Sequence, residues 1–365
     1  MLRPKPNIDK LVPGTHGGIN YLELKKLGIS PEDVLDFSVS INPFGPPPGV
    51  KEALSQAYID RYPDSEATEL RLLLASKLTV TPDNLLIGSG STELIRLVTT
   101  AYFGPEDLVI IPQPTYGDYQ IACYLVGARV LKQPMLEEAN FQLDVNETVD
   151  LIRKHRPQGI FLCTPNNPTG QYLSKEQIDR ILSAARDSLV VLDEAYIAFT
   201  EDIWPSLDLI GRNNLVVLRS MTKDYALAGL RLGYAIAAEP IISVLKQVRP
   251  PWNVSFVAQA AGIHALKVEG YLEACRIKIK EAKEFLLEGL KHLGLSPLPS
   301  QTNFFLVKVG DAAKLSQALL KKGILVRDCT SFGLPNYIRL APRAIAECQR
   351  LLTAIRESEV YCYVR

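Results

Sequence analysis

The feature that most constrains the fold is a regular alternation of strand and helix patterns between residues 66 and 240. Short apolar runs bounded by polar turns predict strands, and longer segments with helical periodicity lie between them. The predicted strands are 83–88, 107–112, 128–133, 159–163, 189–195 and 214–220, and the predicted helices are 68–78, 91–103, 115–127, 149–156 and 175–187. This alternation is typical of an α/β fold with a mostly parallel, doubly wound sheet that helices cover on both faces.

After residue 250 the pattern changes to that of a smaller α+β domain. Residues 255–294 indicate a long helical segment with a break near Gly270, and the elements predicted after it are 303–309, 312–323, 324–329, 336–342 and 344–357. In the last segment Ile345, Cys348 and Leu352 recur at helical spacing, which predicts an amphipathic helix packed on a sheet. We therefore predict an N-terminal arm (1–45) that contributes to the small domain and the active site, a large domain (46–248) and a small domain (249–365).

The charge balance narrows the class of partner. Among the 365 residues, 40 basic side chains cancel 40 acidic ones. A neutral chain has no electrostatic attraction for nucleic acid or an anionic membrane, so the expected partner is a small molecule. The sequence lacks an apolar run of the about 18 residues needed to span a membrane, and its start has no signal-peptide core, so we expect a cytoplasmic protein.

The cysteines and histidines give no sign of a disulfide framework or a metal site. The six cysteines are scattered without C-x-x-C spacing, and none of the four histidines has a second histidine at ligand spacing. This usage predicts reduced, mostly buried thiols in a cytoplasmic protein and no metal. The cysteines are Cys123, Cys163, Cys275, Cys329, Cys348 and Cys362.

Two charged residues in apolar segments are candidates for catalysis. Lys223 stands in the segment RSMTKDYALAGLRLGY at 219–234. A desolvated amine can attack a carbonyl, although a lone lysine in such company more often extends its ammonium to water. Asp193 ends an apolar strand, where a carboxylate is costly unless it is paired. One suitable cation is the protonated ring nitrogen of pyridoxal phosphate (PLP), and the alternative is a helix N-cap.

Other strand ends carry candidates for binding an anion and an aromatic ring. The segment IGSGSTELI predicts a strand, a turn and a helix that begins near Ser91, and a helix start binds anions. It lacks the lysine of an NTP-binding loop. Ser220 and Arg231 could complete a phosphate site, and Tyr116 could provide a flat face for a heteroaromatic ring. Asn167 could bond a ring substituent. Taken singly, each also fits an ordinary turn or a half-buried core position.

The order of these motifs closely resembles that of fold-type-I PLP-dependent enzymes. It comprises a glycine-rich turn, an aromatic residue, N-P-x-G, D-x-x-Y, S-x-x-K and R-x-G-Y. The resemblance implies that Lys223 forms the Schiff base with PLP and that Asp193 pairs with the pyridine nitrogen. It also implies that Tyr196 and Asn167 bond the ring oxygen, that Tyr116 stacks on the ring, and that the phosphate is held by Ser220, Arg231 and the backbone of Gly90, Ser91 and Thr92.

The segment RYPD at 61–64 resembles the one that, in this superfamily, sends a tyrosine into the partner subunit's active site. For this chain that residue is Tyr62. The resemblance therefore implies a homodimer with shared active sites.

Within the superfamily the chain is most similar to the histidinol-phosphate aminotransferases and the threonine-phosphate decarboxylases. THGGIN at 15–20 and LDFSVSINPFGPP at 35–47 resemble decarboxylase segments that touch the phosphorylated substrate. The resemblance implies substrate contacts from His16, Gly17 and Ser40. Arg327 and Arg339, on predicted small-domain strands, are expected to face the cleft, because the arginine fork binds carboxylate and phosphate.

We therefore expect a PLP-dependent carboxy-lyase that converts O-phospho-L-threonine to (R)-1-aminopropan-2-yl phosphate and CO2 in cobalamin biosynthesis. The alternatives are a histidinol-phosphate aminotransferase, or a phosphoserine decarboxylase, because Ser40 replaces the asparagine of the decarboxylase pattern and Ile19 precedes Asn20 instead of following it. Which Cα bond breaks depends on the substrate orientation, which sequence does not reveal. A regulatory module that binds PLP without chemistry is disfavoured by the intact motifs, and a nucleotide-binding protein by the missing G-x-G-x-x-G.

Overall fold

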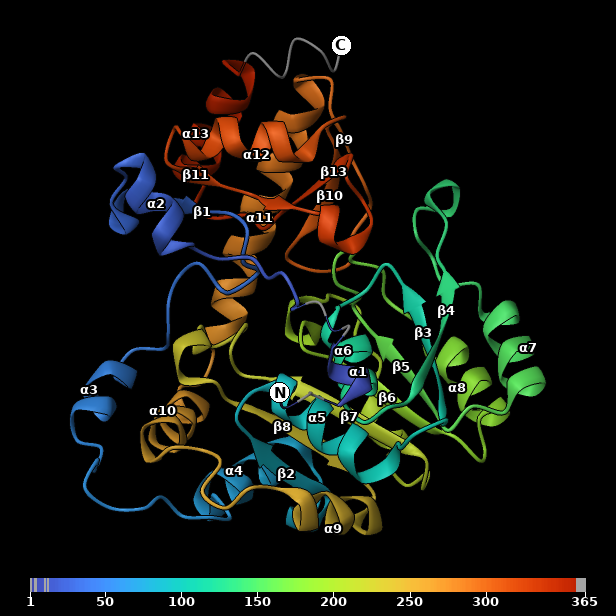
Figure 1. Cartoon of the computed structure of the whole chain (residues 1–365). Coiled ribbons are helices and arrows are strands. Elements are labelled where there is room, and N and C mark those ends of the chain that lie inside the picture. Colours follow the sequence, from blue (N-terminus) through green and yellow to red (C-terminus); the bar gives the residue numbers. More distant parts are fainter. Residues whose placement is uncertain (1, 3–4, 10, 12, 359–365) are drawn as a thin grey trace.

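The chain forms two lobes in the computed structural model, which describes residues 2, 5–9, 11 and 13–358 (Figure 1). The large lobe contains a seven-stranded sheet, and the small lobe contains a four-stranded sheet and the C-terminal helices. Helix α11 (Tyr271–His292) rises from the large lobe into the small one. Cys362 lies outside the described residues, and the other five cysteines are free.

The large sheet confirms the predicted mostly parallel α/β architecture. Its strands, in spatial order, are β2 (Leu85–Gly88), β8 (Gly233–Ala237), β7 (Leu215–Ser220), β6 (Leu189–Asp193), β5 (Gly159–Cys163), β3 (Leu108–Gln113) and β4 (Arg129–Pro134). β8 is antiparallel to both of its neighbours, and the other pairings are parallel. All six predicted strands form, whereas no sequence pattern predicted β8.

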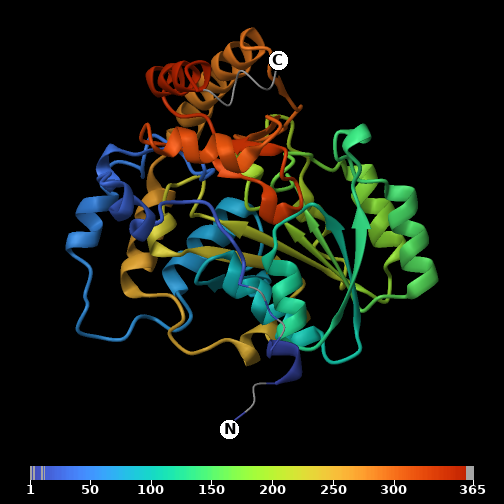
Figure 2. The same ribbon diagram turned by 45° about the horizontal axis from the view of Figure 1, so that its top comes forward.

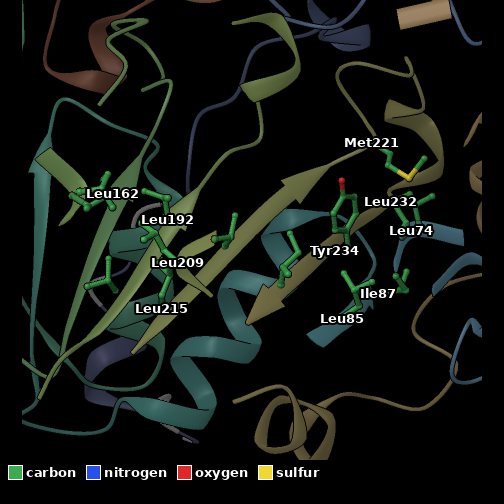
Figure 3. Packing of buried hydrophobic residues seen from close by; sticks show 14 of the residues in the cluster. Leu74, Leu85, Ile87, Leu162, Leu192, Leu209, Leu215, Met221, Leu232 and Tyr234 are labelled. Carbon is green, nitrogen blue, oxygen red and sulfur yellow. The ribbon is translucent and has the colours of Figure 1, made fainter. Parts of the chain in front are cut away.

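Helices cover both faces of this sheet. One face carries α4 (Thr68–Leu78), α7 (Val145–His155), α8 (Lys175–Ala184) and α10 (Phe256–Lys267), and the other carries α5 (Ser91–Tyr102), α6 (Asp118–Leu125) and α9 (Glu239–Val248). Successive strand residues alternate between the faces: Val190 and Leu192 join the first cluster, shown in part in Figure 3, and Val191 joins the second. Full burial of such a side chain contributes about 1.5–3 kcal/mol, so the central strands hold their ends firmly.

The small lobe is assembled from both ends of the chain (Figure 2). Its sheet has the order β12 (Arg327–Asp328), β13 (Tyr337–Leu340), β10 (Phe305–Lys308), β9 (Ser296–Pro297), and α11, α12 (Ala312–Leu320) and α13 (Ile345–Arg356) pack on it. β1 (Leu35–Asp36) pairs in parallel with β11 (Ile324–Leu325). The N-terminal arm therefore completes this lobe.

Helices α10 and α11 form the long helical segment predicted from sequence, interrupted as expected at Gly270, which has φ 70°. α10 packs against α3 (Val50–Ser55) and α4, and its buried residues Ala258 and Ala261 belong to the core of the large lobe. The domain boundary at residue 248 stays a prediction. No helix of the described residues is long and apolar enough to cross a membrane.

The remaining elements are short. The helices are α1 (Pro6–Asp9), which packs on α6, and α2 (Tyr21–Leu27). Single 3-10 turns span Pro31–Asp33, Pro82–Asn84, Glu137–Ala139, Ile197–Phe199, Ser206–Leu209, Ala228–Leu230 and Thr330–Phe332.

Candidate active site

The parallel strands bring the predicted residues to one edge of the large sheet. Asp193 ends β6, Ser220 ends β7, and Asn167 follows β5. Cys163 and Asp193 are direct partners in the β5–β6 register. The carboxyl ends of these strands therefore form the floor of the site, as the fold class predicts.

Asp193 is a buried carboxylate whose hydrogen-bond donors are neutral. The Tyr119 hydroxyl donates to Oδ2 over 2.7 Å, and the backbone N–H of Ala195 donates to Oδ1 over 2.9 Å. Burial raises the pKa of Asp193 above its ordinary value, and these two hydrogen bonds oppose that rise. A carboxylate held in this way is suited to a cationic partner, such as a protonated heteroaromatic nitrogen.

Two tyrosines of the 115–125 segment stand beside this carboxylate. The Tyr116 hydroxyl lies 3.2 Å from Oγ1 of Thr92, at the start of α5. The Tyr116 ring meets the ring of Tyr119 edge-on, with 5.5 Å between the centroids. Burial raises the pKa of both phenols, so both are neutral. Tyr116 thus lies between the anion-binding helix start and the floor of the site.

Lys223 is half-buried and follows β7, the direct neighbour of the strand that ends in Asp193. Its Nζ is 5.7 Å from the centroid of the Tyr196 ring, and that ring packs edge-on against Phe304. The arm fixes the backbone here: the Asn42 N–H donates to the Lys223 carbonyl over 2.8 Å, and its Nδ2 donates to the Asp224 carbonyl over 3.0 Å. The lysine therefore rests on a loop that the N-terminal arm holds.

The turn between β2 and α5 forms a cup of backbone N–H groups and hydroxyls. Gly90 precedes α5 with φ 79°, and a Cβ there would lie 2.7 Å from Nη2 of Arg231. A Cβ on Gly233 would lie 3.1 Å from the Ser91 nitrogen. The Ser220 hydroxyl lies 2.6 Å from the Thr222 hydroxyl. A helix start with an adjacent arginine and serine has the donors that a phosphate needs.

The two small-lobe arginines form a pair on neighbouring strands. Arg327 and Arg339 are direct partners in the β12–β13 register, and both are buried. Arg339 donates to Oδ1 of Asn167 and to the Ser38 carbonyl, and Arg327 donates to the Thr15 carbonyl. These acceptors are uncharged. Burial and the charge of Arg339 lower the pKa of Arg327, so an anion bound between them would relieve their repulsion.

The segment 15–18 of the arm bridges the two lobes. A Cβ on Gly17 would lie 2.7 Å from the Ser38 carbonyl oxygen, and the Gly18 N–H donates to the Ser38 hydroxyl over 2.8 Å. His16 Nε2 lies 3.8 Å from Oδ1 of Asp118 on α6. Only a residue without a side chain fits at Gly17. The close approach of Gly17 to Ser38 leaves His16 beside Asp118 of the large lobe.

Ser40 and Tyr62 differ from the other predicted residues. Ser40 is buried, and its hydroxyl has no hydrogen-bond partner among the residues that the structure describes. Tyr62 is 75% exposed and stacks on Trp252 with 4.3 Å between ring centroids. In the single chain Tyr62 thus lies on the surface, where its ring contacts Trp252.

Several residues of the site had no sequence prediction, namely Ser38, Asn42, Asp118, Tyr119 and Thr222. Tyr119 carries only a weak signal: the predicted helix 115–127 places it on the same face as Tyr116, whereas α6 begins at Asp118 and leaves Tyr116 before it. The others act through backbone contacts or close approaches that only the folded chain creates.

The functional groups of this site fit PLP. The strand-end carboxylate suits a ring nitrogen, the lysine suits an aldehyde, and the cup at α5 suits a phosphate. The fold and the site together define the class of fold-type-I PLP-dependent enzymes, with PLP as the cofactor.

Comparison with known proteins agrees with that class. The chain belongs to the aminotransferase class I and II family, whose model matches residues 32–355. It is 36% identical to the histidinol-phosphate aminotransferase of Moorella thermoacetica over 341 residues, which cover 91% of this chain and 87% of the relative.

Two solved structures are also similar. The histidinol-phosphate aminotransferase of Sinorhizobium meliloti, in complex with pyridoxal-5'-phosphate, has a TM-score of 0.88 and 26% identity, and the match covers 100% of this chain and 99% of that one. The L-threonine-O-3-phosphate decarboxylase of Porphyromonas gingivalis has a TM-score of 0.77 and 27% identity, and the match covers 88% of this chain and 98% of that one.

Proposed function

We propose that this protein is a PLP-dependent decarboxylase of O-phospho-L-threonine that releases CO2 and (R)-1-aminopropan-2-yl phosphate. The observation that carries the proposal is the pair of buried arginines, Arg327 and Arg339, beside the His16–Gly17 segment. A substrate with both a carboxylate and a phosphate supplies one anion for each of the two arginines.

In this proposal the strand-end residues hold the cofactor. Lys223 would hold its aldehyde, and Asp193 would pair with its ring nitrogen. Asn167 and Tyr196 bond its ring oxygen, Tyr116 stacks on the ring, and the phosphate is held by Gly90, Ser91, Thr92, Ser220 and Arg231. When bound, PLP withdraws electrons from the Cα of the amino acid attached to it.

The small lobe and the arm would orient the substrate. Arg339, held by Asn167 and Ser38, takes the carboxylate, and Arg327, His16, Gly17 and Ser40 take the phosphate. Anchoring both ends of the substrate would fix its orientation and so select which bond at Cα breaks. The Lys223 amine would deliver the proton that replaces CO2 at Cα.

Histidinol-phosphate aminotransferase is a second candidate, which the relatives favour by name. Both substrates carry a phosphate monoester, so the buried arginines suit either one. The two substrates differ in that histidinol phosphate has no carboxylate. In an aminotransferase the arginine that binds carboxylate would instead bind the second substrate, a 2-oxo acid. Phosphoserine decarboxylation is a variant of the first proposal, because Ser40 is shorter than the asparagine of the decarboxylase pattern.

One assay separates these reactions. Purified protein with PLP is given O-phospho-L-threonine without a 2-oxo acid, and separately histidinol phosphate with 2-oxoglutarate. We expect CO2 and the amine phosphate in the first mixture and no glutamate in the second, with Lys223→Ala inactive in both. Stoichiometric glutamate in the second mixture and no CO2 in the first would overturn the proposal. O-phospho-L-serine in place of phosphothreonine shows whether the enzyme requires the methyl group of the phosphothreonine side chain.

The wider setting follows from the same proposal. We infer a homodimer in which Tyr62 of each subunit reaches the other active site, since Tyr62 is exposed in the single chain. The product fits the linker of cobalamin-type corrinoids, and the free cysteines suit the reducing cytoplasm.

A further inference from the structure

The hydroxyl of Tyr119 makes a direct contact with the carboxylate on which the proposed cofactor site depends. It donates to Oδ2 of Asp193 over 2.7 Å, across 74 residues of sequence, and both side chains are buried. The other oxygen of Asp193 is held by its own turn through the Ala195 N–H. Tyr119 is therefore the side-chain donor that fixes the rotation of the carboxyl group.

The ring of Tyr119 is itself held in place. It stacks on Phe161 of β5 with 4.9 Å between centroids and an interplanar angle of 12°, and it meets Tyr116 edge-on. Burial raises the pKa of Tyr119 well above that of a free phenol, so the hydroxyl keeps its proton. The Tyr119 hydroxyl is thus a neutral donor, held rigidly, that points at the Asp193 carboxylate.

The surroundings of Asp193 act on its charge in both directions. Burial raises its pKa most, and the hydrogen bond from Tyr119 is the strongest of the influences that oppose the rise. Glu194 raises the pKa further and Lys223 lowers it. The neighbouring thiol of Cys163 is neutral, because burial and the charge of Asp193 raise its pKa to about 12.

We propose that Tyr119 is a positioning residue that keeps Asp193 ionised and aimed at the ring nitrogen of the cofactor. The inference rests on the proposed PLP site and adds a residue to it. Its consequence is specific: loss of the hydroxyl should weaken recognition of the ring nitrogen and leave recognition of the phosphate and the aldehyde intact.

The test compares two ligands on two proteins. The apoprotein and Tyr119→Phe, which keeps the stacked ring, are titrated with PLP and with an analogue in which C–H replaces the ring nitrogen. Equilibrium dialysis gives the four dissociation constants. A hydrogen bond to a charged group contributes enough that we expect the preference for PLP over the analogue to fall about tenfold or more in Tyr119→Phe.

A purely structural role gives a different result, because both ligands would then weaken by the same factor. Equal weakening with an unchanged preference overturns the inference and leaves the proposed site standing. A wild-type protein without any preference for the ring nitrogen overturns the role of Asp193 as well. Tyr337→Phe is the matched control: its hydroxyl, on β13 of the small lobe, donates over 2.7 Å to Glu137 in the turn after β4, and its loss should leave the preference unchanged.

A second substitution covers the case in which Tyr119→Phe does not fold. Site-specific Tyr119→3,5-difluorotyrosine keeps the hydroxyl and makes it a stronger donor. We expect the preference for PLP over the analogue to be retained or to increase. A preference lost in this variant would contradict the inference, because the donor is still present.

Discussion

Asp224, the residue after Lys223, carries a carboxyl group in an unfavourable place. Its Oδ1 accepts the Tyr225 N–H over 2.9 Å, and burial raises the pKa of the group to about 7. The folded protein therefore binds a proton at Asp224 more tightly than the unfolded chain does. Ionisation of Asp224 therefore lowers the free energy of unfolding as the pH rises from about 4 to about 7.

We expect Asp224→Asn to remove this dependence. The amide keeps an oxygen for the Tyr225 N–H and cannot ionise, so the variant should be more stable than wild type at pH 8, by a margin that shrinks toward pH 5. Thermal melting of the apoprotein across this range measures the difference. Asp60→Asn, at an exposed position, should show no such trend. A variant less stable than wild type at pH 8 would contradict the assignment.

At this scale sequence reasoning identified the residues with unusual chemistry, and missed those whose role depends on folding. Asp193 and Lys223 stand out because a charge in an apolar run is costly and needs a reason. Tyr119 does not stand out, because its hydroxyl meets a partner 74 residues away that no local pattern reveals. Ser38 acts partly through its backbone carbonyl, which any residue has.

Among the elements, the start of α5 is the most constrained. Gly90 has φ 79° and ψ 166°, a backbone conformation that is essentially limited to glycine. Its missing side chain also makes room for Arg231, whose Nη2 would be 2.7 Å from a Cβ there. A side chain added at Gly90 would therefore both strain the backbone and collide with Arg231.

We expect Gly90→Ala to weaken PLP binding about tenfold or more, because it distorts the N–H groups and displaces the arginine. The dissociation constant is measured by dialysis of the apoprotein. Gly333→Ala is the control, since Gly333 has φ 80° with no atom within 4 Å of the added Cβ. It should lower stability and leave PLP affinity unchanged. An unaltered affinity in Gly90→Ala would remove this turn from the phosphate site.

The strands show where pattern reasoning works and where it stops. The central strands are predictable because each is a continuous apolar run between polar turns. β8 was missed because its five residues, GYAIA, overlap the R-x-G-Y motif, and its antiparallel place between β2 and β7 depends on pairing with strands far apart in sequence. Similarly, β1 is two residues long and forms only against β11.

The whole molecule is proposed to work as a dimer, and its sites can be tested by mixing subunits. Tyr62→Ala and Lys223→Ala should each be nearly inactive. A mixed dimer contains one site with both residues intact, so co-refolded equal amounts should recover about a quarter of wild-type activity, as random pairing requires. Activity is measured as CO2 release.

The result distinguishes sharing from independence. If each subunit used its own Tyr62, no mixed dimer would have a complete site and no activity would return. Trp252→Ala is a useful companion, because Trp252 stacks on Tyr62 without belonging to the proposed site. We expect it to lower activity less than Tyr62→Ala does.

The pairing of β1 with β11 bears on how the chain is made in the cell. The first forty residues leave the ribosome early, but β11, with which β1 pairs, is synthesised about 290 residues later. The seven-stranded lobe can therefore fold before β1 has its partner. Final closure of the second lobe is thus reserved for a chain whose translation is nearly finished. A premature stop codon before Ile324 should yield a folded large lobe in which the β1 segment has no strand to pair with and is cut by limited proteolysis.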